Sequence, residues 1–268
     1  MRYVPCFFAL QANYGDMLTL HILNFFARRM FSNLEFVHTN NPNAARVIGI
    51  GSIVGAVSPE FQGYVWTTGN ALDKLSIHAK NAKVVAVRGK QTLKALNREK
   101  TNTVIFGDGG LLLHRVFDKP VLKRFKYGFI PHVAEHDIAQ SCALMRCASV
   151  RFINLRDTVP AVTEAIKSCQ YIISSSLHGL VVADAFEIPN FRVQISNRII
   201  GGNYKYEDYY SAFSDTVPPT LVLTATHTDK DLDKWFATHK YERPNLKQIQ
   251  ADLWTATKAM VQTISDTS

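Results

Sequence analysis

The sequence lacks any apolar run that approaches the roughly 20 residues of a membrane-spanning helix. Its apolar beginning, residues 1–10, is too short for a secretory signal peptide, is interrupted by Pro5, and leads into no small-residue cleavage site. We interpret these residues as a first β-strand. The absence of a span or signal predicts a cytoplasmic protein, at most peripheral to the inner face of the membrane.

Cysteine is also scarce. The four cysteines, Cys6, Cys142, Cys147 and Cys169, lack the paired close spacings of a zinc site. We expect reduced, mostly buried thiols, which favours a reducing compartment. The sequence predicts no metal site.

Acidic residues are outnumbered, with 22 Asp and Glu against 30 Lys and Arg and a formal charge of +8. This excess favours an anionic partner: a phosphorylated substrate, a nucleotide, a membrane surface or nucleic acid. A basic cluster lies at residues 119–126, but no basic stripe is interleaved with aromatic residues, so we expect no nucleic-acid partner. A hydrophobic content of 47% with 19% charged residues is ample for a sizeable core.

Strand and helix patterns alternate in both halves of the chain, which predicts an α/β fold of two Rossmann-like parallel-sheet units. We place these units at residues 1–122 and 123–268, the second including the C-terminal helices. The predicted strands are 1–10, 34–38, 45–54, 64–67, 83–88, 127–132, 150–155, 171–173 and 190–195. The predicted helices are 16–31, 92–97, 158–169, one from about residue 178, 229–240 and 245–263.

The stretch 171–190 predicts a short buried strand, a serine-rich turn and an apolar helix that begins near His178. Ser174, Ser175 and Ser176 are suited to cap that helix. The free N–H groups and dipole of such a helix start attract an anion, and His178 stands beside them. A core histidine in an ordinary strand–turn–helix unit would give the same pattern.

Three other positions follow predicted strands. Arg88 lies at a carboxyl end, where ligands bind in open α/β sheets, and a guanidinium can hold a carboxylate or phosphate with two parallel bonds. A surface arginine paired with an acid is the alternative. Gly15 precedes a helix that we expect Asp16 to cap, and it either admits a ligand or only makes the turn. Asp108 is predicted on a tight turn.

The stretch 174–189, Ser-Ser-Ser-Leu-His-Gly-Leu-Val-Val-Ala-Asp-Ala-Phe-Glu-Ile-Pro, resembles the signature of the polysaccharide pyruvyl transferase family. Many members carry Arg where this chain has Ser176. Weaker similarities are Asn-Tyr-Gly-Asp at 13–16, Val-Arg-Gly-Lys-Gln-Thr at 87–92, Gly-Asp-Gly-Gly-Leu-Leu at 107–112, Gly-Phe-Ile-Pro-His at 128–132 and Lys-Tyr-Glu-Asp-Tyr at 205–209. Lys90 and Gly109 replace prolines of the family pattern.

The resemblance implies two Rossmann-like units that face each other across a cleft, as in many glycosyltransferases. It also implies transfer of a pyruvyl group from phosphoenolpyruvate to a sugar or lipid-linked saccharide of a polysaccharide, glycan or glycolipid precursor, giving a cyclic ketal without a cofactor. The implied catalytic residues are His178 and Arg88. The implied donor contacts are Ser175, Ser176, Gly179 and His132, and the implied acceptor contacts are Asn13, Gly15, Asp16, Lys205 and Asp208.

Two other functions fit the same pattern. A glycosyltransferase that uses a nucleotide sugar would share the architecture, because a fold does not decide a function. A non-catalytic carbohydrate-binding relative is the second, in view of Ser176. The aromatic segment 204–213 suits either a sugar ring or plain packing.

Overall fold

The computed structural model describes residues 1–9, 14–73, 79–98 and 104–267. Within these residues every strand pairing is parallel, and the strands form two sheets. The six-stranded sheet has the order β2 (Leu34–His38), β1 (Arg2–Phe7), β3 (Val47–Ile48), β4 (Tyr64–Thr68), β5 (Lys83–Val87), β6 (Ile105–Phe106). The five-stranded sheet has the order β11 (Leu221–Val222), β10 (Asn190–Gln194), β9 (Cys169–Ser174), β7 (Phe125–Ile130), β8 (Val150–Phe152).

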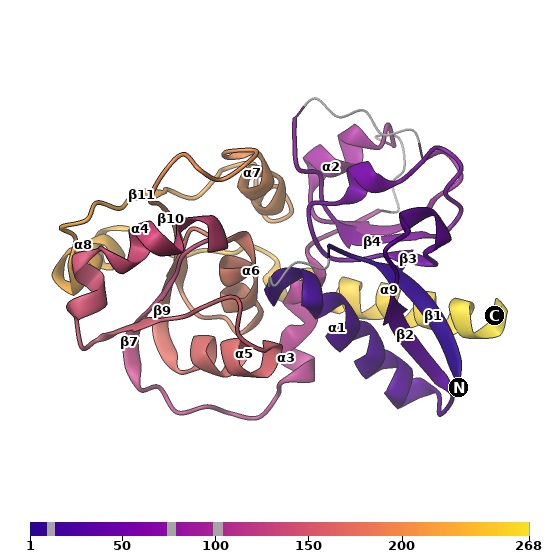
Figure 1. Ribbon diagram of the computed structural model, residues 1–268, viewed down its shortest axis with the longest axis horizontal. Helices are drawn as coiled ribbons and strands as arrows, with labels where there is room; N and C mark the ends of the chain where they lie inside the picture. The colour runs from indigo at the N-terminus through magenta and orange to yellow at the C-terminus, as the bar shows by residue number, and fades with distance from the viewer. Residues whose placement is uncertain (10–13, 74–78, 99–103, 268) are drawn as a thin grey trace.

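Helices connect the strands and cover the sheets (Figure 1). They are α1 (Tyr14–Met30), α2 (Lys90–Ala95), α3 (Leu113–Val116), α4 (His136–Gln140), α5 (Val159–Lys167), α6 (Leu177–Ala185), α7 (Tyr204–Tyr210), α8 (Asp229–Thr238) and α9 (Leu246–Thr267). The predicted α/β fold with two Rossmann-like sheets is therefore confirmed. Parallel strands are covered on both faces, and accordingly every residue of β4 is buried and β5 reads Val-Val-Ala-Val after its exposed Lys83.

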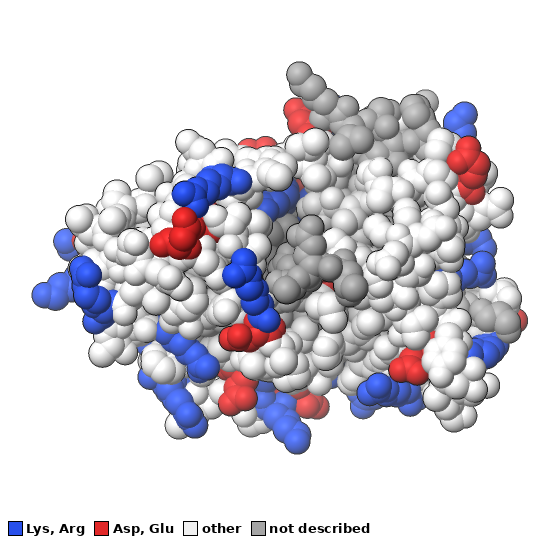
Figure 2. Space-filling model, in the orientation of Figure 1, with Lys and Arg blue, Asp and Glu red and all other residues white. Residues whose placement is uncertain are grey.

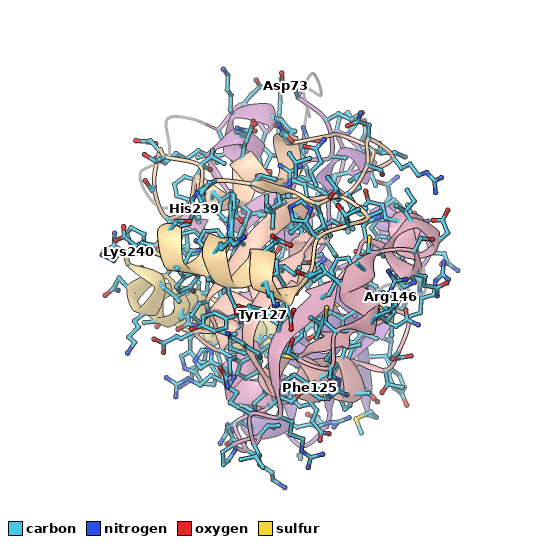
Figure 3. The ribbon with its side chains drawn as sticks, turned by 90° about the vertical axis from the view of Figure 1, so that its left-hand side faces the viewer. Asp73, Phe125, Tyr127, Arg146, His239 and Lys240 are labelled. Carbon is cyan, nitrogen blue, oxygen red and sulfur yellow. The ribbon has the colours of Figure 1, made fainter. Side chains whose placement is uncertain are left out.

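The two sheets share a hydrophobic core. One cluster of buried side chains includes Val4 of β1, Leu111 after β6 and Ile172 of β9. The helix α6 lies at its centre with all of its residues buried, as its apolar sequence predicts. Separate clusters lie on the outer faces of each sheet. In the second sheet the outer cluster is closed by α8, which lies beside Tyr127 in Figure 3. The ring of Phe236 on α8 lies 5.7 Å from that of Tyr127.

The chain crosses back at its end. Helix α9 packs beside α1 against the first sheet (Figure 1). Thr257 of α9 accepts a hydrogen bond from Trp66 Nε1 at 2.9 Å, and Ser265 accepts one from Arg2 at 2.8 Å. The sequence analysis placed this helix with the second unit. Its apolar stripe at helical spacing indicates that it is covered but cannot indicate by which sheet.

Several predicted boundaries are wrong: the helix expected at 92–97 is Lys90–Ala95, and the strand expected at 150–155 ends at Phe152. Two further differences have local reasons. The strand expected at 45–54 is only Val47–Ile48, because Gly51 has a φ of +131° and turns the chain. Asp16 does not cap α1 but lies inside its first turn. The helix begins at Tyr14, whose N–H donates to the carbonyl of Leu155 at 2.9 Å. A loop of the second unit therefore satisfies the first turn of α1.

All four cysteines are free thiols, with Cys147 half-buried and the others buried. Across the described ranges no helix is both long and apolar enough to cross a membrane.

Candidate active site

Each sheet has one point at which its strand order reverses, and the segments that follow the strands at these two points lie close together. The second sheet reverses between β7 and β9, and the first between β1 and β3. Ligands of open α/β sheets bind at such switch points, outside the carboxyl ends of the strands. His132 follows β7 and Ser175 follows β9, whereas Gly15 belongs to the helix that comes after β1. A hydrogen bond from His132 to Ser175 and the packing of Gly15 against His178 bring these segments together.

His178 lies in the first turn of α6 with 7% of its surface exposed. The backbone of Gly15 is packed against its imidazole, so that a Cβ added at Gly15 would lie 1.7 Å from His178 Nδ1. The sequence analysis assigned Gly15 to the acceptor. The structure shows that glycine is needed here because the neighbour of this backbone is the histidine ring of the other unit.

The opposite ring nitrogen faces Asp108, which follows β6. His178 Nε2 lies 3.6 Å from Asp108 Oδ2, and neither atom has a hydrogen-bond partner among the described residues. Asp108 Oδ1 accepts a bond from the N–H of Gly110 at 2.9 Å, and so caps the 3-10 helix η3 (Gly109–Leu112). The predicted turn role of Asp108 is therefore confirmed. Its second oxygen is directed at His178, a partnership that the sequence analysis missed.

The hydroxyls of Ser174 and Ser175 stabilise the serine turn, residues 174–176. Ser174 Oγ accepts a bond from the N–H of Ser176 at 3.0 Å, and a Cβ at Gly179 would lie 2.3 Å from this Oγ. Ser175 Oγ donates to Glu135 Oε2 at 2.5 Å and accepts from the N–H of His132 at 2.9 Å. Ser176 occupies the N-cap position of α6 without a side-chain capping bond. The capping prediction is therefore wrong, because Ser174 Oγ bonds within the turn, Ser175 Oγ bonds to Glu135, and Ser176 Oγ makes no capping bond.

Arg88 is 1% exposed and has hydrogen bonds from all three guanidinium nitrogens. Its Nε donates to Asp208 Oδ2 at 2.9 Å, its Nη1 to Ser52 at 2.7 Å and its Nη2 to the carbonyl of Asn70 at 2.7 Å. Asp208 belongs to α7, so this buried ion pair joins the first sheet to the second unit.

Asp208 has further partners on the first unit. Its Oδ1 accepts from the N–H of Thr92 at 2.9 Å, and its Oδ2 from the hydroxyl of Thr92 at 2.7 Å. Gly89 lets α7 approach, since a Cβ there would lie 1.7 Å from the carbonyl oxygen of Asp208. Asp208, predicted to contact the acceptor, is fully buried in this junction.

Lys205 and His132 lie between the two units. Burial, reinforced by the positive charges of Arg88 and Arg192, lowers the pKa of Lys205 to about 8. Glu135 and Asp16 act in the opposite direction. Burial lowers the pKa of His132 to about 4, and the charges of Lys205 and His178 add to the effect. His132 is therefore neutral near pH 7, and Lys205 is poised to lose its charge just above that pH.

Sequence reasoning also missed Arg192, on β10. Its guanidinium carbon lies 3.8 Å from the centre of the Tyr206 ring, and the hydroxyl of Tyr206 donates to the carbonyl of Ser175 at 2.6 Å. Arg192 is 7% exposed, yet it has no hydrogen bond or ion pair to a described residue, and its Nε is buried without a partner. Nothing in the surrounding sequence, Asn-Phe-Arg-Val-Gln, distinguishes it from a surface arginine of a strand.

The structure thus brings together His178, His132, Lys205, Arg88 and the serine turn. Asn13 lies outside the described residues. The rings of Tyr206, Tyr209 and Tyr210 are buried, so they pack the junction and offer no exposed shelf for a sugar. No cluster of His, Cys, Asp and Glu suited to a metal ion occurs in the part of the chain that the structure describes. On the face shown in Figure 2, Lys and Arg are spread over the surface with Asp and Glu between them.

These features define an α/β protein with two parallel sheets, which presents a histidine–aspartate pair and buried cations where the sheets meet. Residues 43–197 match the polysaccharide pyruvyl transferase family. Because the match covers more than half of the chain, the protein belongs to this family.

Two curated proteins are similar over part of their length. The chain is 32% identical over 140 residues to Uncharacterized protein L143 of Acanthamoeba polyphaga mimivirus, covering 47% of each chain. It is 26% identical over 149 residues to the succinoglycan biosynthesis protein ExoV of Rhizobium meliloti (strain 1021), covering 53% of this chain and 46% of ExoV. The chain spans about half the length of these relatives.

Proposed function

We propose that this protein transfers a pyruvyl group from phosphoenolpyruvate to two hydroxyls of one sugar, giving a cyclic ketal. The observation that carries the proposal is the pair formed by His178 Nε2 and Asp108 Oδ2, buried 3.6 Å apart without other partners. The pair lies at the start of α6, within the segment that matches the family. A titratable ring beside a carboxylate is suited to deliver a proton.

The reaction balances without a redox centre. A proton adds to the methylene carbon of phosphoenolpyruvate, which becomes a methyl group, and the neighbouring carbon becomes electrophilic. One sugar hydroxyl attacks that carbon and loses its proton. The bond from this carbon to the phosphate oxygen breaks, with its electron pair leaving on phosphate, and the second hydroxyl attacks and loses its proton. Two protons are released and one is consumed, so hydrogen phosphate carries away the remaining proton.

We assign the proton delivery to His178. The packing of Gly15 against one side of the ring and of Asp108 near the other fixes its orientation. The carboxylate of Asp108 stabilises positive charge on the ring whenever the ring is protonated. The first turn of α6, which includes Gly179, provides backbone N–H groups and a dipole that suit the anionic donor, and His132 borders the serine turn. The N–H groups of Ser175 and Ser176 are already bonded to the carbonyl of Ile130 and to Ser174 Oγ, so these two serines shape the turn that faces the donor.

Arg88 contributes differently from the sequence-based prediction. A direct grip on the donor requires that Asp208 release the guanidinium, because all three nitrogens are engaged. We therefore propose that Arg88 positions the junction and adds positive potential to it. Asp16, whose charge acts on Lys205, remains our candidate for contact with the acceptor sugar. The acceptor is proposed to be a polysaccharide, glycan or glycolipid precursor.

The test is to incubate the protein with phosphoenolpyruvate and candidate saccharides. Release of phosphate together with a pyruvyl mass gain on the sugar supports the proposal. Replacing His178 with Gln keeps its size but removes the imidazole that would deliver the proton, and should lower turnover by about two to four orders of magnitude. The melting temperature should barely change. A folded and fully active His178→Gln protein would refute the mechanism.

Two alternatives are separated by binding. Phosphoenolpyruvate should raise the melting temperature of the protein, because a ligand that binds the folded state stabilises it. UDP-sugars should do less. The reverse order would favour a glycosyltransferase, and binding of saccharides without turnover of either donor would favour a non-catalytic carbohydrate-binding relative.

A further inference from the structure

Arg192 is a buried cation without an anion. It lies in the middle of β10, paired in register with Ser174, the residue that ends β9 and begins the serine turn. Only 7% of its surface is exposed, its guanidinium has no hydrogen bond or ion pair to a described residue, and its Nε is buried. Burying a guanidinium without an acid partner is unfavourable, so a position like this indicates a partner that arrives from outside.

Glu135, an acid in the same neighbourhood, is engaged by other groups. The charge of Glu135 acts on both Lys205 and Tyr206, which places it in the same neighbourhood as Arg192. Both of its carboxylate oxygens accept short serine hydrogen bonds, Oε2 from Ser175 at 2.5 Å and Oε1 from Ser196 at 2.6 Å. Glu135 therefore stabilises the serine turn and leaves the guanidinium available.

Tyr206 fixes how Arg192 can be used. The tyrosine ring covers one face of the guanidinium at 3.8 Å, so a ligand must approach the edge, where the N–H groups lie in one plane. Lys205 Nζ lies 5.3 Å from the centre of the same ring and has no ion pair within the described ranges. The planar edge of the Arg192 guanidinium can donate two parallel hydrogen bonds, and the ammonium of Lys205 adds a second positive charge beside it. This combination matches a phosphate group, which offers several acceptor oxygens and two negative charges.

We propose that Arg192 binds the phosphate group of the donor, at a subsite completed by Lys205 and the start of α6. The guanidinium stacks on the ring of Tyr206, and the Tyr206 hydroxyl donates a hydrogen bond to the carbonyl of Ser175. The phosphate is thereby held beside the turn that presents His178. This inference rests on the proposed function, because it assigns the part of the donor that each side of the site recognises.

The test measures binding by calorimetry with three probes: phosphoenolpyruvate, inorganic phosphate and pyruvate. Arg192→Gln should weaken phosphoenolpyruvate and inorganic phosphate about ten- to a hundredfold, the range for one lost charge-assisted contact, and leave pyruvate nearly unchanged. Arg198→Gln is the matched control, since it removes an exposed arginine of the same unit that pairs with Asp137 at 2.7 Å. It should leave all three affinities unchanged.

Arg192→Lys carries the test if Arg192→Gln does not fold, because it keeps the charge and the apolar stem but loses the planar edge. It should lower phosphate affinity about tenfold. Unchanged phosphate affinity in the folded variants overturns the inference, and so does a loss confined to pyruvate, which would assign Arg192 to the carboxylate.

The two proposals fail separately. If the wild-type protein forms the ketal and Arg192→Gln leaves phosphate affinity unchanged, only the phosphate subsite is refuted. If phosphate binding depends on Arg192 but the protein forms no ketal from phosphoenolpyruvate, only the proposed function is refuted.

Discussion

Gly15 and His178 are packed so closely that a single methyl group at Gly15 would lie 1.7 Å from the imidazole nitrogen Nδ1. The two residues belong to different units, since Gly15 lies in the first turn of the helix after β1 and His178 in the first turn of the helix after β9. The first unit thus supplies one wall of the histidine's environment, and Asp108, from the same unit, faces the other side of the ring.

Gly15→Ala should therefore act through His178. The new methyl group must displace the ring or α1, and we expect a loss of about 1–3 kcal/mol in the free energy of unfolding from overpacking. Turnover should also fall, because the displaced ring can no longer deliver its proton. The check is a double-mutant cycle: in a His178→Gln background, Gly15→Ala should cost little further activity. Additive losses would show that Gly15 acts elsewhere.

Asp108→Asn separates charge from capping. The side chain keeps its size and an oxygen that can accept the bond from Gly110, so the 3-10 helix should stay capped. Without the carboxylate, positive charge on His178 loses its stabilisation, and turnover should fall by about two orders of magnitude. Asp108→Ala adds the loss of the cap, about 1 kcal/mol of stability, which chemical denaturation measures. If Asp108→Asn retained full turnover, the carboxylate would serve only the turn.

The ion pair between Arg88 and Asp208 should dominate the stability of the junction. Arg88→Gln leaves Asp208 as an uncompensated buried charge, and we expect a loss of about 3–5 kcal/mol in the free energy of unfolding. The exposed pair of Lys90 with Asp215 is the control, because such pairs contribute about 0–1 kcal/mol. Equal, small effects at both sites would contradict a structural role for Arg88.

Donor affinity distinguishes the two roles of Arg88. If it positions the junction, Asp208→Asn and Arg88→Lys should weaken phosphoenolpyruvate to similar, modest extents. If Arg88 grips the donor directly, Arg88→Lys should weaken binding strongly. Asp208→Asn, which releases the guanidinium, should then leave binding unchanged or improve it.

Lys205 predicts how donor binding depends on pH. Burial first, and then neighbouring positive charge, lowers its pKa to about 8, so its charge is present at pH 7 and largely lost by pH 9. Donor affinity should accordingly fall as the pH rises through about 8, while the donor phosphate, with a pKa of about 6, stays fully ionised. Lys205→Arg should keep its charge and retain affinity at pH 9. An affinity for the acceptor that changes instead would assign Lys205 to the sugar, as its sequence motif suggests.

Loss of the proton from Lys205 should weaken donor binding as the pH rises, but the same lowered pKa makes the folded state more stable as the pH rises. The pKa of Lys205 in the folded state lies below its ordinary value of 10.5, so between about pH 8 and 10.5 the unfolded chain holds a proton that the folded chain has lost. This residue therefore makes the free energy of unfolding rise with pH in that window. A Lys205→Met variant should lack this rise in denaturation measured between pH 7.5 and 10.

The sequence by itself determined the local elements and the family. The strand Leu34–His38 was predicted at its observed bounds, and the helix after Thr158 begins as its threonine and Pro160 indicate. These features depend on neighbouring residues, through side-chain periodicity and capping. The His178 segment was recognisable for the same reason, because its strand, turn and helix are contiguous.

Only the tertiary structure decided what the polar side chains face. Arg88 and Asp208 stand 120 positions apart in the sequence, and neither shows that the other neutralises it. The partnership of Asp108 with His178 arises where connections of two sheets meet. Arg192 is buried without an ion pair to a described residue, and the neighbouring Glu135 accepts hydrogen bonds from two serines. Burial and charge pairing depend on the arrangement of distant segments in space, which side-chain periodicity does not encode.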